Sequence, residues 1–118
     1  MAVRARRIGT ILEVECEGDC DLDAAPAMES AISRAARLGV RLLLIDLSRT
    51  RTLDSSGVRM LLRARGEAES LAGRVVVVGL QPETRRVLDL LGLGRVMRCV
   101  ATRDEAIAYL MSAASPRP

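Results

Sequence analysis

The stretch from Leu42 to Leu62, LLLIDLSRTRTLDSSGVRMLL, decides how the rest of the chain is read. An apolar run ends in Asp46, a short polar segment follows, and an amphipathic run begins directly after Asp54-Ser55-Ser56-Gly57. This pattern predicts a buried strand, a loop and a helix. The start of a helix stabilises an anion, because unpaired backbone N–H groups and the positive end of the helix dipole gather there. One of the two serines is therefore well placed to carry a phosphate.

Strand and helix patterns alternate on both sides of this stretch. Strands are predicted at residues 3–8, 10–17, 40–47, 74–78 and 96–100, and helices at 24–38, 57–71 and 82–91. A capping box at 102–105 predicts a fourth helix. The order ββαβαβαβα indicates an α/β (α+β) fold, in which about four helices pack mostly on one face of a mixed sheet of about five strands.

Residue spacing predicts which side of each element is buried. In the second strand, Glu13, Glu15 and Glu17 alternate with apolar residues, so they are expected on a face open to water. Asp23 is predicted as the N-cap of the first helix, and Gly39 is predicted just beyond its end. The expected inward positions are Val58, Leu61, Leu62, Ala68 and Leu71 in the second helix, and Ala106, Ile107, Leu110 and Met111 in the last.

Composition excludes several classes of function. The 118 residues include no His, and every basic residue is Arg. A Ser–His–Asp or Cys–His nucleophile and the lysine of phosphate-binding loops are therefore excluded. The chain has no Trp or Phe and a single Tyr, which predicts an aliphatic core and disfavours nucleic-acid readers that stack bases on aromatic rings. The arginines are scattered, and we expect no direct contact with nucleic acid.

The size of the chain fits one domain, predicted at residues 1–111, followed by a flexible tail at 112–118. Cys16, Cys20 and Cys99 are too few for a disulfide framework, so a reduced, cytoplasmic protein is expected, with Cys16 and Cys99 as buried thiols. No apolar run reaches the ~20 residues of a membrane span, so membrane insertion is not expected.

Two polar segments have both a structural and a functional interpretation. Asp19, Asp21 and Asp23 resemble the start of a calcium loop, but Ala24 and Ser30 stand where that loop needs Gly and Glu. They form either a polar turn with a helix cap or an acidic lip near the strand ends. The DSSG segment at 54–57 is either a cap or a site. Because no base or Lys lies beside Ser56 in the sequence, its modification would need another protein.

Several short motifs, in order, resemble the STAS domain family and in particular bacterial anti-sigma factor antagonists. They are GDCDLDAAP at 18–26, IDLS at 45–48, DSSGV at 54–58, VGL at 78–80 followed by Pro82, and VLDLLGL at 87–93. The resemblance implies that the unphosphorylated chain binds an anti-sigma factor that is also a serine kinase, which frees a sigma factor. It also implies that the kinase phosphorylates Ser56, that a serine phosphatase reverses this, and that Asp21 and Asp54 flank the serine.

The resemblance further implies no catalytic residue, metal or cofactor in this chain, because ATP belongs to the partner kinase. We expect a partner-binding surface made of Asp21, Asp23, Asp54, Ser55, Gly57, Val58, Arg59 and Arg63. A phosphate adds about −1.5 to −2 charge. Its expected effect is a local electrostatic and steric block, since tenfold weaker binding needs only about 1.4 kcal/mol. The protein is expected to be a monomer or a weak dimer.

The chain departs from the family pattern at Cys20, where an aliphatic residue is usual, and at Thr50-Arg51-Thr52, which replaces a more apolar stretch. These departures leave the partner open. An alternative is a non-catalytic STAS subunit of a lipid-transport ABC complex or of a stress-signalling complex. An enzyme of the serine-hydrolase type is disfavoured by the lack of His.

Overall fold

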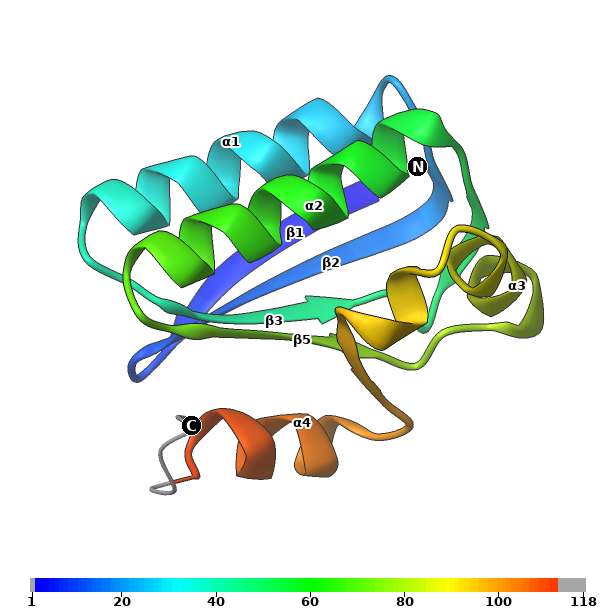
Figure 1. The fold of residues 1–118 in the computed structure, drawn as a ribbon. Helices are drawn as coiled ribbons and strands as arrows, with labels where there is room; N and C mark the ends of the chain where they lie inside the picture. Colours follow the sequence, from blue (N-terminus) through cyan, green and yellow to red (C-terminus); the bar gives the residue numbers. More distant parts are fainter. Residues whose placement is uncertain (1, 113–118) are drawn as a thin grey trace.

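A mixed six-stranded sheet organises the protein in the computed structural model, which describes residues 2–112 (Figure 1). The predicted tail at 112–118 lies outside the described residues, apart from Ser112. The strand order is β1-β2-β3-β5-β6. The short strand β4 stands outside this order and pairs with the last residues of β2. Only the β1–β2 pair is antiparallel among the pairs of the described residues. The strands are β1 (Ala2–Ile8), β2 (Ile11–Cys20), β3 (Leu42–Asp46), β4 (Thr50–Leu53), β5 (Arg74–Val78) and β6 (Arg98–Val100).

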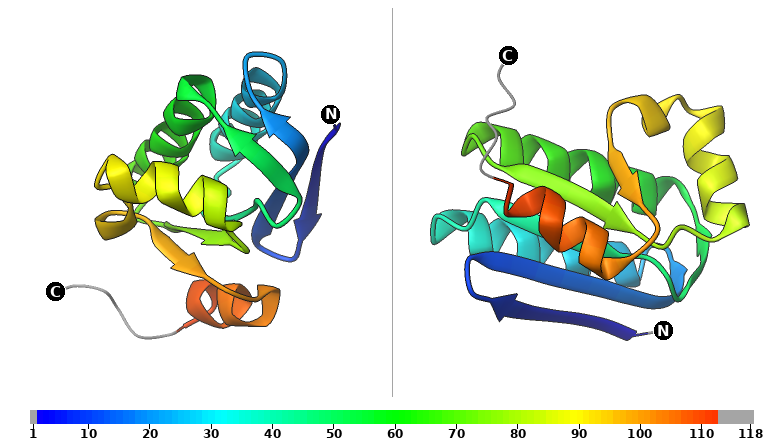
Figure 2. Two further views of the ribbon diagram at one scale, coloured as in Figure 1. Left: turned by 90° about the vertical axis from the view of Figure 1, so that its right-hand side faces the viewer. Right: turned by 90° about the horizontal axis from the view of Figure 1, so that it is seen from below.

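The helices cover the two faces of the sheet unequally. They are α1 (Ala24–Arg37), α2 (Ser55–Ser70), α3 (Pro82–Leu90), the 3-10 turn η1 (Leu93–Arg95) and α4 (Arg103–Leu110). Helices α1 and α2 lie side by side on one face, and α4 lies on the opposite face (Figure 2). The predicted α/β fold, with a mixed sheet and most helices on one face, is confirmed. None of these helices is long and apolar enough to span a membrane.

Strand β4 was not expected, because residues 50–53 look like a polar loop in the sequence. Thr50 is fully buried, and its hydroxyl donates a hydrogen bond of 2.7 Å to the carbonyl oxygen of Cys16. Leu53 is also buried. A β-branched residue at one end and an apolar residue at the other therefore anchor the segment, while Arg51 and Thr52 stay exposed.

Two aliphatic cores fill the space on either side of the sheet. The larger lies under α1 and α2, and the smaller lies between the sheet and α4. Leu62 was predicted to face inward but is 42% exposed, and Met60 is buried instead. The reason is that the buried side of α2 runs through Gly57, Leu61 and Ala68 rather than through Val58. Met111 was also predicted to pack inward, but it is 57% exposed, because α4 ends at Leu110.

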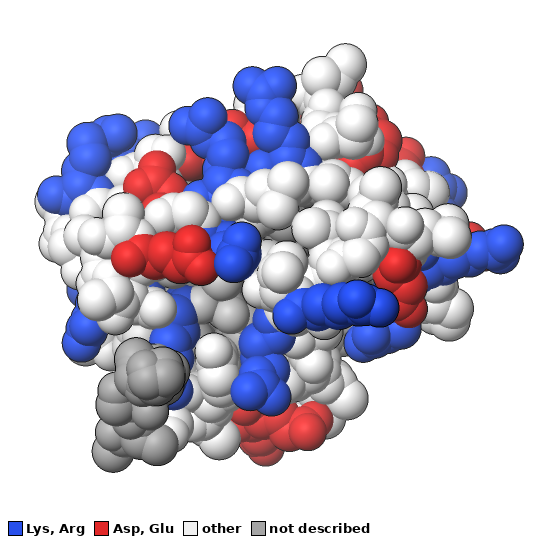
Figure 3. All heavy atoms as spheres, viewed as in Figure 1, with Lys and Arg blue, Asp and Glu red and all other residues white. Residues whose placement is uncertain are grey.

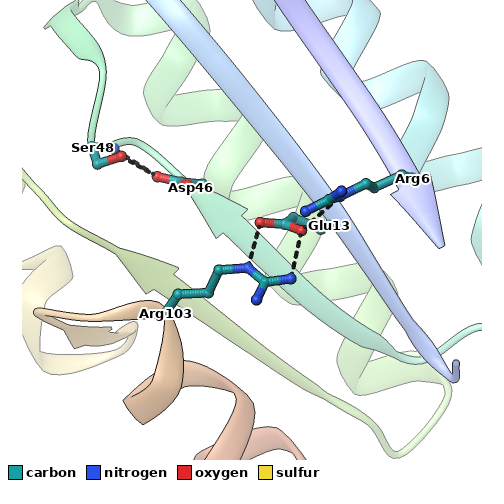
Figure 4. A network of polar contacts seen from close by, with 5 residues as sticks. All are labelled: Arg6, Glu13, Asp46, Ser48 and Arg103. Carbon is teal, nitrogen blue, oxygen red and sulfur yellow. Dashed lines mark hydrogen bonds and ion pairs between the residues drawn. The ribbon is translucent and has the colours of Figure 1, made fainter. Parts of the chain in front are cut away.

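The prediction that Glu13 lies on a face of β2 open to water is wrong. The side chain points toward α4, and its residue is only 6% exposed. Arg103, the first residue of α4, donates two hydrogen bonds of 3.1 and 3.2 Å to the carboxylate, and Arg6 of β1 donates a third of 3.1 Å (Figure 4). The bond from Arg103 lowers the pKa of Glu13, against burial, which raises it, and Arg6 lowers it further. This network ties α4 to the outer strands.

Candidate functional site

The pairing of β2 with β4 brings the two polar segments of the sequence together. Strand β2 runs three residues past its predicted end, through a bulge between Gly18 and Asp19, and Cys20 pairs with Leu53. The backbone N–H of Asp54 then donates a hydrogen bond of 3.3 Å to the carbonyl oxygen of Cys20. The turn that contains Asp21 and Asp23 therefore begins beside the start of α2. The resemblance implies that Asp21 and Asp54 flank Ser56, and this pairing brings the two segments that contain these aspartates side by side.

Asp54 caps α2. Its backbone is extended, and its carboxylate oxygen Oδ1 accepts hydrogen bonds from the backbone N–H groups of Ser56 at 2.8 Å and Gly57 at 3.2 Å. The helix starts at Ser55, two residues earlier than the sequence indicated, so both serines lie in its first turn. Two of the N–H groups that an added anion would use are therefore already bound by Asp54.

The hydroxyls of Ser55 and Ser56 are not hydrogen-bonded to any group in the part of the chain that the structure describes. Ser55 is exposed and Ser56 is half-buried. Within residues 2–112, neither hydroxyl makes a side-chain hydrogen bond. A half-buried hydroxyl usually finds a partner in a fold that needs it for stability. Both side chains are therefore accessible to a protein that docks at this end of α2.

Gly57 lets α2 approach the end of β2 closely. A Cβ atom at this position would lie 2.4 Å from Cδ1 of Leu53, 2.8 Å from the carbonyl oxygen of Cys20 and 3.0 Å from its Sγ. The Cys20 thiol is fully buried and contacts the sulfur of Met28 at 3.9 Å. Cys20 thus packs as a small apolar residue, which explains why the fold accepts it where the family usually has an aliphatic side chain.

The three aspartates of the 19–23 segment have separate surroundings. Asp19 accepts hydrogen bonds from Arg51 at 3.1 Å and from the hydroxyl of Thr52 at 2.8 Å, across the β2–β4 pair. Oδ1 of Asp21 accepts from the N–H groups of Asp23 and Ala24 at the start of α1. The predicted N-cap Asp23 occupies the cap position, but its side chain makes no capping bond. The N–H of Ala25 donates to the backbone oxygen of Asp21 instead, and Pro26 has no N–H to donate.

The negative charges of Asp54 and Asp21 both act on the thiol of Cys20. Hydrogen bonding with Cys16 and burial raise the pKa of the Cys20 thiol most, and the charges of Asp54 and Asp21 raise it further. A phosphate on Ser56 would add a third negative group to the two carboxylates that already act on the buried Cys20 thiol. Cys20 itself stays protonated at neutral pH.

The outward side of α2 carries the other predicted docking residues. Val58 is half-buried and Arg59 is exposed, while Arg63 pairs with Glu29 of α1 at 3.6 Å. Two exposed leucines were not among the predicted docking residues: Leu62, one turn after Val58, and Leu22, in the turn between Asp21 and Asp23, which is 76% exposed. The signal that could have found Leu22 is its position as an apolar residue in the middle of an acidic turn.

Few groups in the described part of the chain could take part in chemistry at Ser56. No group of three or more Cys, Asp or Glu side chains in the described part of the chain is arranged to hold a metal ion. The carboxylate of Asp54 accepts from the backbone N–H of Ser56, and no base is bonded to the Ser56 hydroxyl within residues 2–112. Within these residues, no side chain is bonded to the Ser56 hydroxyl in a way that would activate it as a nucleophile.

Comparisons with known proteins agree with the fold and with the motifs. The family model of the STAS domain matches residues 2–106. The anti-sigma F factor antagonist of Lysinibacillus sphaericus is 34% identical over 91 residues, which cover 76% of this chain and 77% of that protein. The anti-sigma-F factor antagonist RsfB of Mycobacterium tuberculosis is 33% identical over 90 residues, which cover 76% of this chain and 73% of that protein. The phosphorylated form of the Bacillus cell fate determinant SpoIIAA superposes with a TM-score of 0.75 at 29% identity, over 92% of this chain and 98% of that one.

Proposed function

The chain belongs to the STAS domain family, and on this premise we propose that it is an anti-sigma factor antagonist that works by partner switching. Unphosphorylated, it binds an anti-sigma factor that is also a serine kinase, and a sigma factor is released. Phosphorylation of Ser56 ends the binding, and a serine phosphatase restores it. The observation that carries this proposal is the accessible hydroxyl in the first turn of α2, which no other described group uses.

The switch acts locally, through charge. Asp54 already binds the N–H groups of Ser56 and Gly57, so a phosphate on Ser56 cannot take those groups without displacing a carboxylate. The phosphate adds about −1.5 to −2 charge beside Asp54 and near Asp21. A partner that tolerates the two carboxylates in the unphosphorylated protein would then meet a phosphate, which is larger and more highly charged. The sheet and the helices need not move.

The docking surface includes apolar anchors as well as charges. Leu22 and Leu62 extend the predicted set, because exposed leucines beside a polar rim are typical of binding surfaces. The full proposed surface is Asp21, Leu22, Asp23, Asp54, Ser55, Gly57, Val58, Arg59, Leu62 and Arg63. In this surface Gly57 acts through the close approach of α2 to β2, not through a side chain.

The proposal assigns no catalytic step and no cofactor to this chain. The kinase supplies ATP, the hydroxyl oxygen of Ser56 attacks the γ-phosphorus, ADP leaves, and the hydroxyl proton passes to a base of the kinase. The proposal includes a cytoplasmic location and a monomeric or weakly dimeric state.

A phosphorylation assay tests the site. The protein is incubated with a candidate anti-sigma serine kinase and ATP, and incorporated phosphate is located by mass spectrometry. Wild type and Ser55→Ala should both carry phosphate on Ser56, while Ser56→Ala should incorporate none. Ser55 is the matched control, because it is the adjacent, exposed serine of the same turn. Undiminished incorporation in Ser56→Ala would refute the assignment.

A binding titration tests the charge block. Ser56→Asp should bind the same kinase at least tenfold more weakly than wild type, and Ser56→Asn, which is similar in size but uncharged, should bind more strongly than Ser56→Asp. Equal affinities for the two variants would show that size rather than charge decides. Recovery of an ABC ATPase in a pull-down, without phosphate on Ser56, would instead favour the transport-complex alternative.

A further inference from the structure

The open edge of the sheet at β6 carries a second surface, far along the strand order from the phosphorylation site. Strand β6 pairs with β5 on one side and ends the strand order of the described sheet on the other. A hollow of about 440 Å³ lies along this edge, between η1 and α4. Its lining includes Arg85 of α3, Arg95 of η1 and Arg98 of β6.

These three guanidinium groups carry unneutralised charge. The six ion pairs found among residues 2–112 use other arginines. The side chains of Arg85, Arg95 and Arg98 make no hydrogen bond to any described residue. Figure 3 faces this edge and shows blue side chains over much of the face, some of them in its lower half, at the level of β6 and α4 in Figure 1. Three cations that line one hollow, on the two sides of β6, indicate a site for an anionic partner.

The chain's single aromatic residue holds one of these arginines in place. The guanidinium carbon of Arg98 lies 4.8 Å from the centre of the Tyr109 ring, and that of Arg74 lies 5.1 Å from it. Arg74 also donates a hydrogen bond of 2.7 Å to the backbone oxygen of Tyr109. A guanidinium fixed over a ring loses less side-chain entropy when it binds a carboxylate. Arg98 is therefore a preorganised group at the rim of the hollow.

The positive charge of the hollow is only partly balanced. A Cβ atom built on Gly94, which lines the hollow, would lie 2.9 Å from Oδ1 of Asp89, so one carboxylate lies nearby. Burial raises the pKa of the Cys99 thiol, Arg85 lowers it and Asp89 raises it, so the thiol stays neutral at pH 7. Three arginines against one aspartate leave a net positive site.

We propose that the β6 edge binds an extended acidic segment of a partner protein, which adds to the sheet as a further strand. An unpaired strand edge offers backbone donors and acceptors to such a segment. Arg98 lies on the α4 side of β6, in register with Val76, while Cys99 and the nearby Arg85 lie on the other side. Because successive side chains of a strand point to opposite faces, consecutive acidic residues would reach guanidinium groups on both sides. Exposed Val96 offers an apolar contact at the end of the hollow.

A peptide titration tests this surface. The probe is a fluorescein-labelled peptide with a central run of glutamates between valines, and binding is followed by fluorescence anisotropy at low ionic strength. Arg95→Gln and Arg98→Gln should each weaken binding about tenfold, as expected for the loss of a charge-assisted hydrogen bond. Asp89→Asn should strengthen it severalfold. Arg86→Gln is the matched control, because Arg86 is the exposed neighbour of Arg85 on α3 but does not line the hollow.

Any of four outcomes would overturn the proposal. One is an undetectable affinity of the glutamate peptide for wild type. The second is an equal loss in Arg86→Gln, which would mean that only the overall charge matters. The third is undiminished binding of the same peptide with N-methylated glutamates, which cannot donate backbone hydrogen bonds. The fourth is displacement of the unmodified peptide by inorganic phosphate more strongly than by chloride at equal ionic strength. Either result would indicate a site for free anions rather than the addition of a strand. Phosphorylation of Ser56 should be unchanged in every variant, so this proposal and the partner switch can fail separately.

Discussion

The starts of α2 and α4 are both capped, but they leave different groups free. At α4, the Thr102 hydroxyl accepts from the N–H of Glu105, and the Glu105 carboxylate accepts in return from the N–H of Thr102. The next residue, Arg103, is bound to Glu13. At α2, the carboxylate of Asp54 accepts from two N–H groups, and no side chain returns the contact within the described residues.

This difference separates a structural helix start from one that can serve a partner. At α4 the polar groups of the cap bond each other, so they stabilise the helix start and are not available to a binding partner. In the first turn of α2, by contrast, Ser55 and Ser56 have hydroxyls that no other described group bonds. Both starts match cap patterns in the sequence, so only the three-dimensional partners distinguish them.

The largest effect expected at either helix start comes from Gly57→Ala. The added methyl would overlap the Cys20 carbonyl, which is backbone and cannot turn aside, and should destabilise the protein by roughly 3 kcal/mol in urea unfolding. Gly66→Ala is the control, since it lies in the same helix with no atom within 4 Å of the added group. It should stabilise by up to about 1 kcal/mol through helix propensity. Similar changes in the two variants would mean that α2 does not pack as closely on β2 as the structure has it.

Removing the clamp at α4 should have the next largest effect. Glu13→Gln replaces a carboxylate that accepts three hydrogen bonds from two arginines and should cost about 2 kcal/mol in urea unfolding. Glu15→Gln, the next residue on the same face of β2, makes no ion pair within residues 2–112 and should change stability by less than about 0.5 kcal/mol. If both substitutions proved neutral, α4 would not depend on Glu13.

Acid should remove the same contribution gradually. Because the bond from Arg103 lowers the pKa of Glu13 in the folded protein below its ordinary value of 4.5, the carboxylate stabilises the fold fully above that value. The contribution is lost as the pH falls through the lowered folded pKa. The stability difference between wild type and Glu13→Gln should therefore be constant from about pH 5 to 7 and shrink below pH 4.5. A difference that grows on acidification would contradict the assignment.

The sequence predicted the parts of the fold that depend on local pattern. Apolar runs located β3 and β5, Gly39 with a φ of +83° ends α1 as expected, and the capping box of α4 is confirmed. The DSSG segment was also placed correctly at a helix start, because Asp and Ser favour caps wherever they occur.

Features that depend on pairing between distant segments could not be predicted in this way. Strand β4 forms because Thr50 bonds to Cys16, 34 positions away. Glu13 is buried because Arg103, 90 positions away, reaches it. At the site, the two acidic segments lie together only through the β2–β4 register. Periodicity carries no information on such partners, so residues 50–53 were read as a loop and Glu13 was placed on an open face.

The smallest expected effects come from the caps themselves, and they test the difference between the two helix starts most directly. Asp54→Ala and Thr102→Ala should each cost about 1 kcal/mol in urea unfolding, because each leaves backbone N–H groups without a partner. Asp54→Asn should recover most of that loss, since asparagine caps as well as aspartate does. If Asp54→Asn were as unstable as Asp54→Ala, the charge rather than the capping bond would stabilise α2. The start of α2 would then depend on electrostatics, and a phosphate on Ser56 would change its stability as well as its partner.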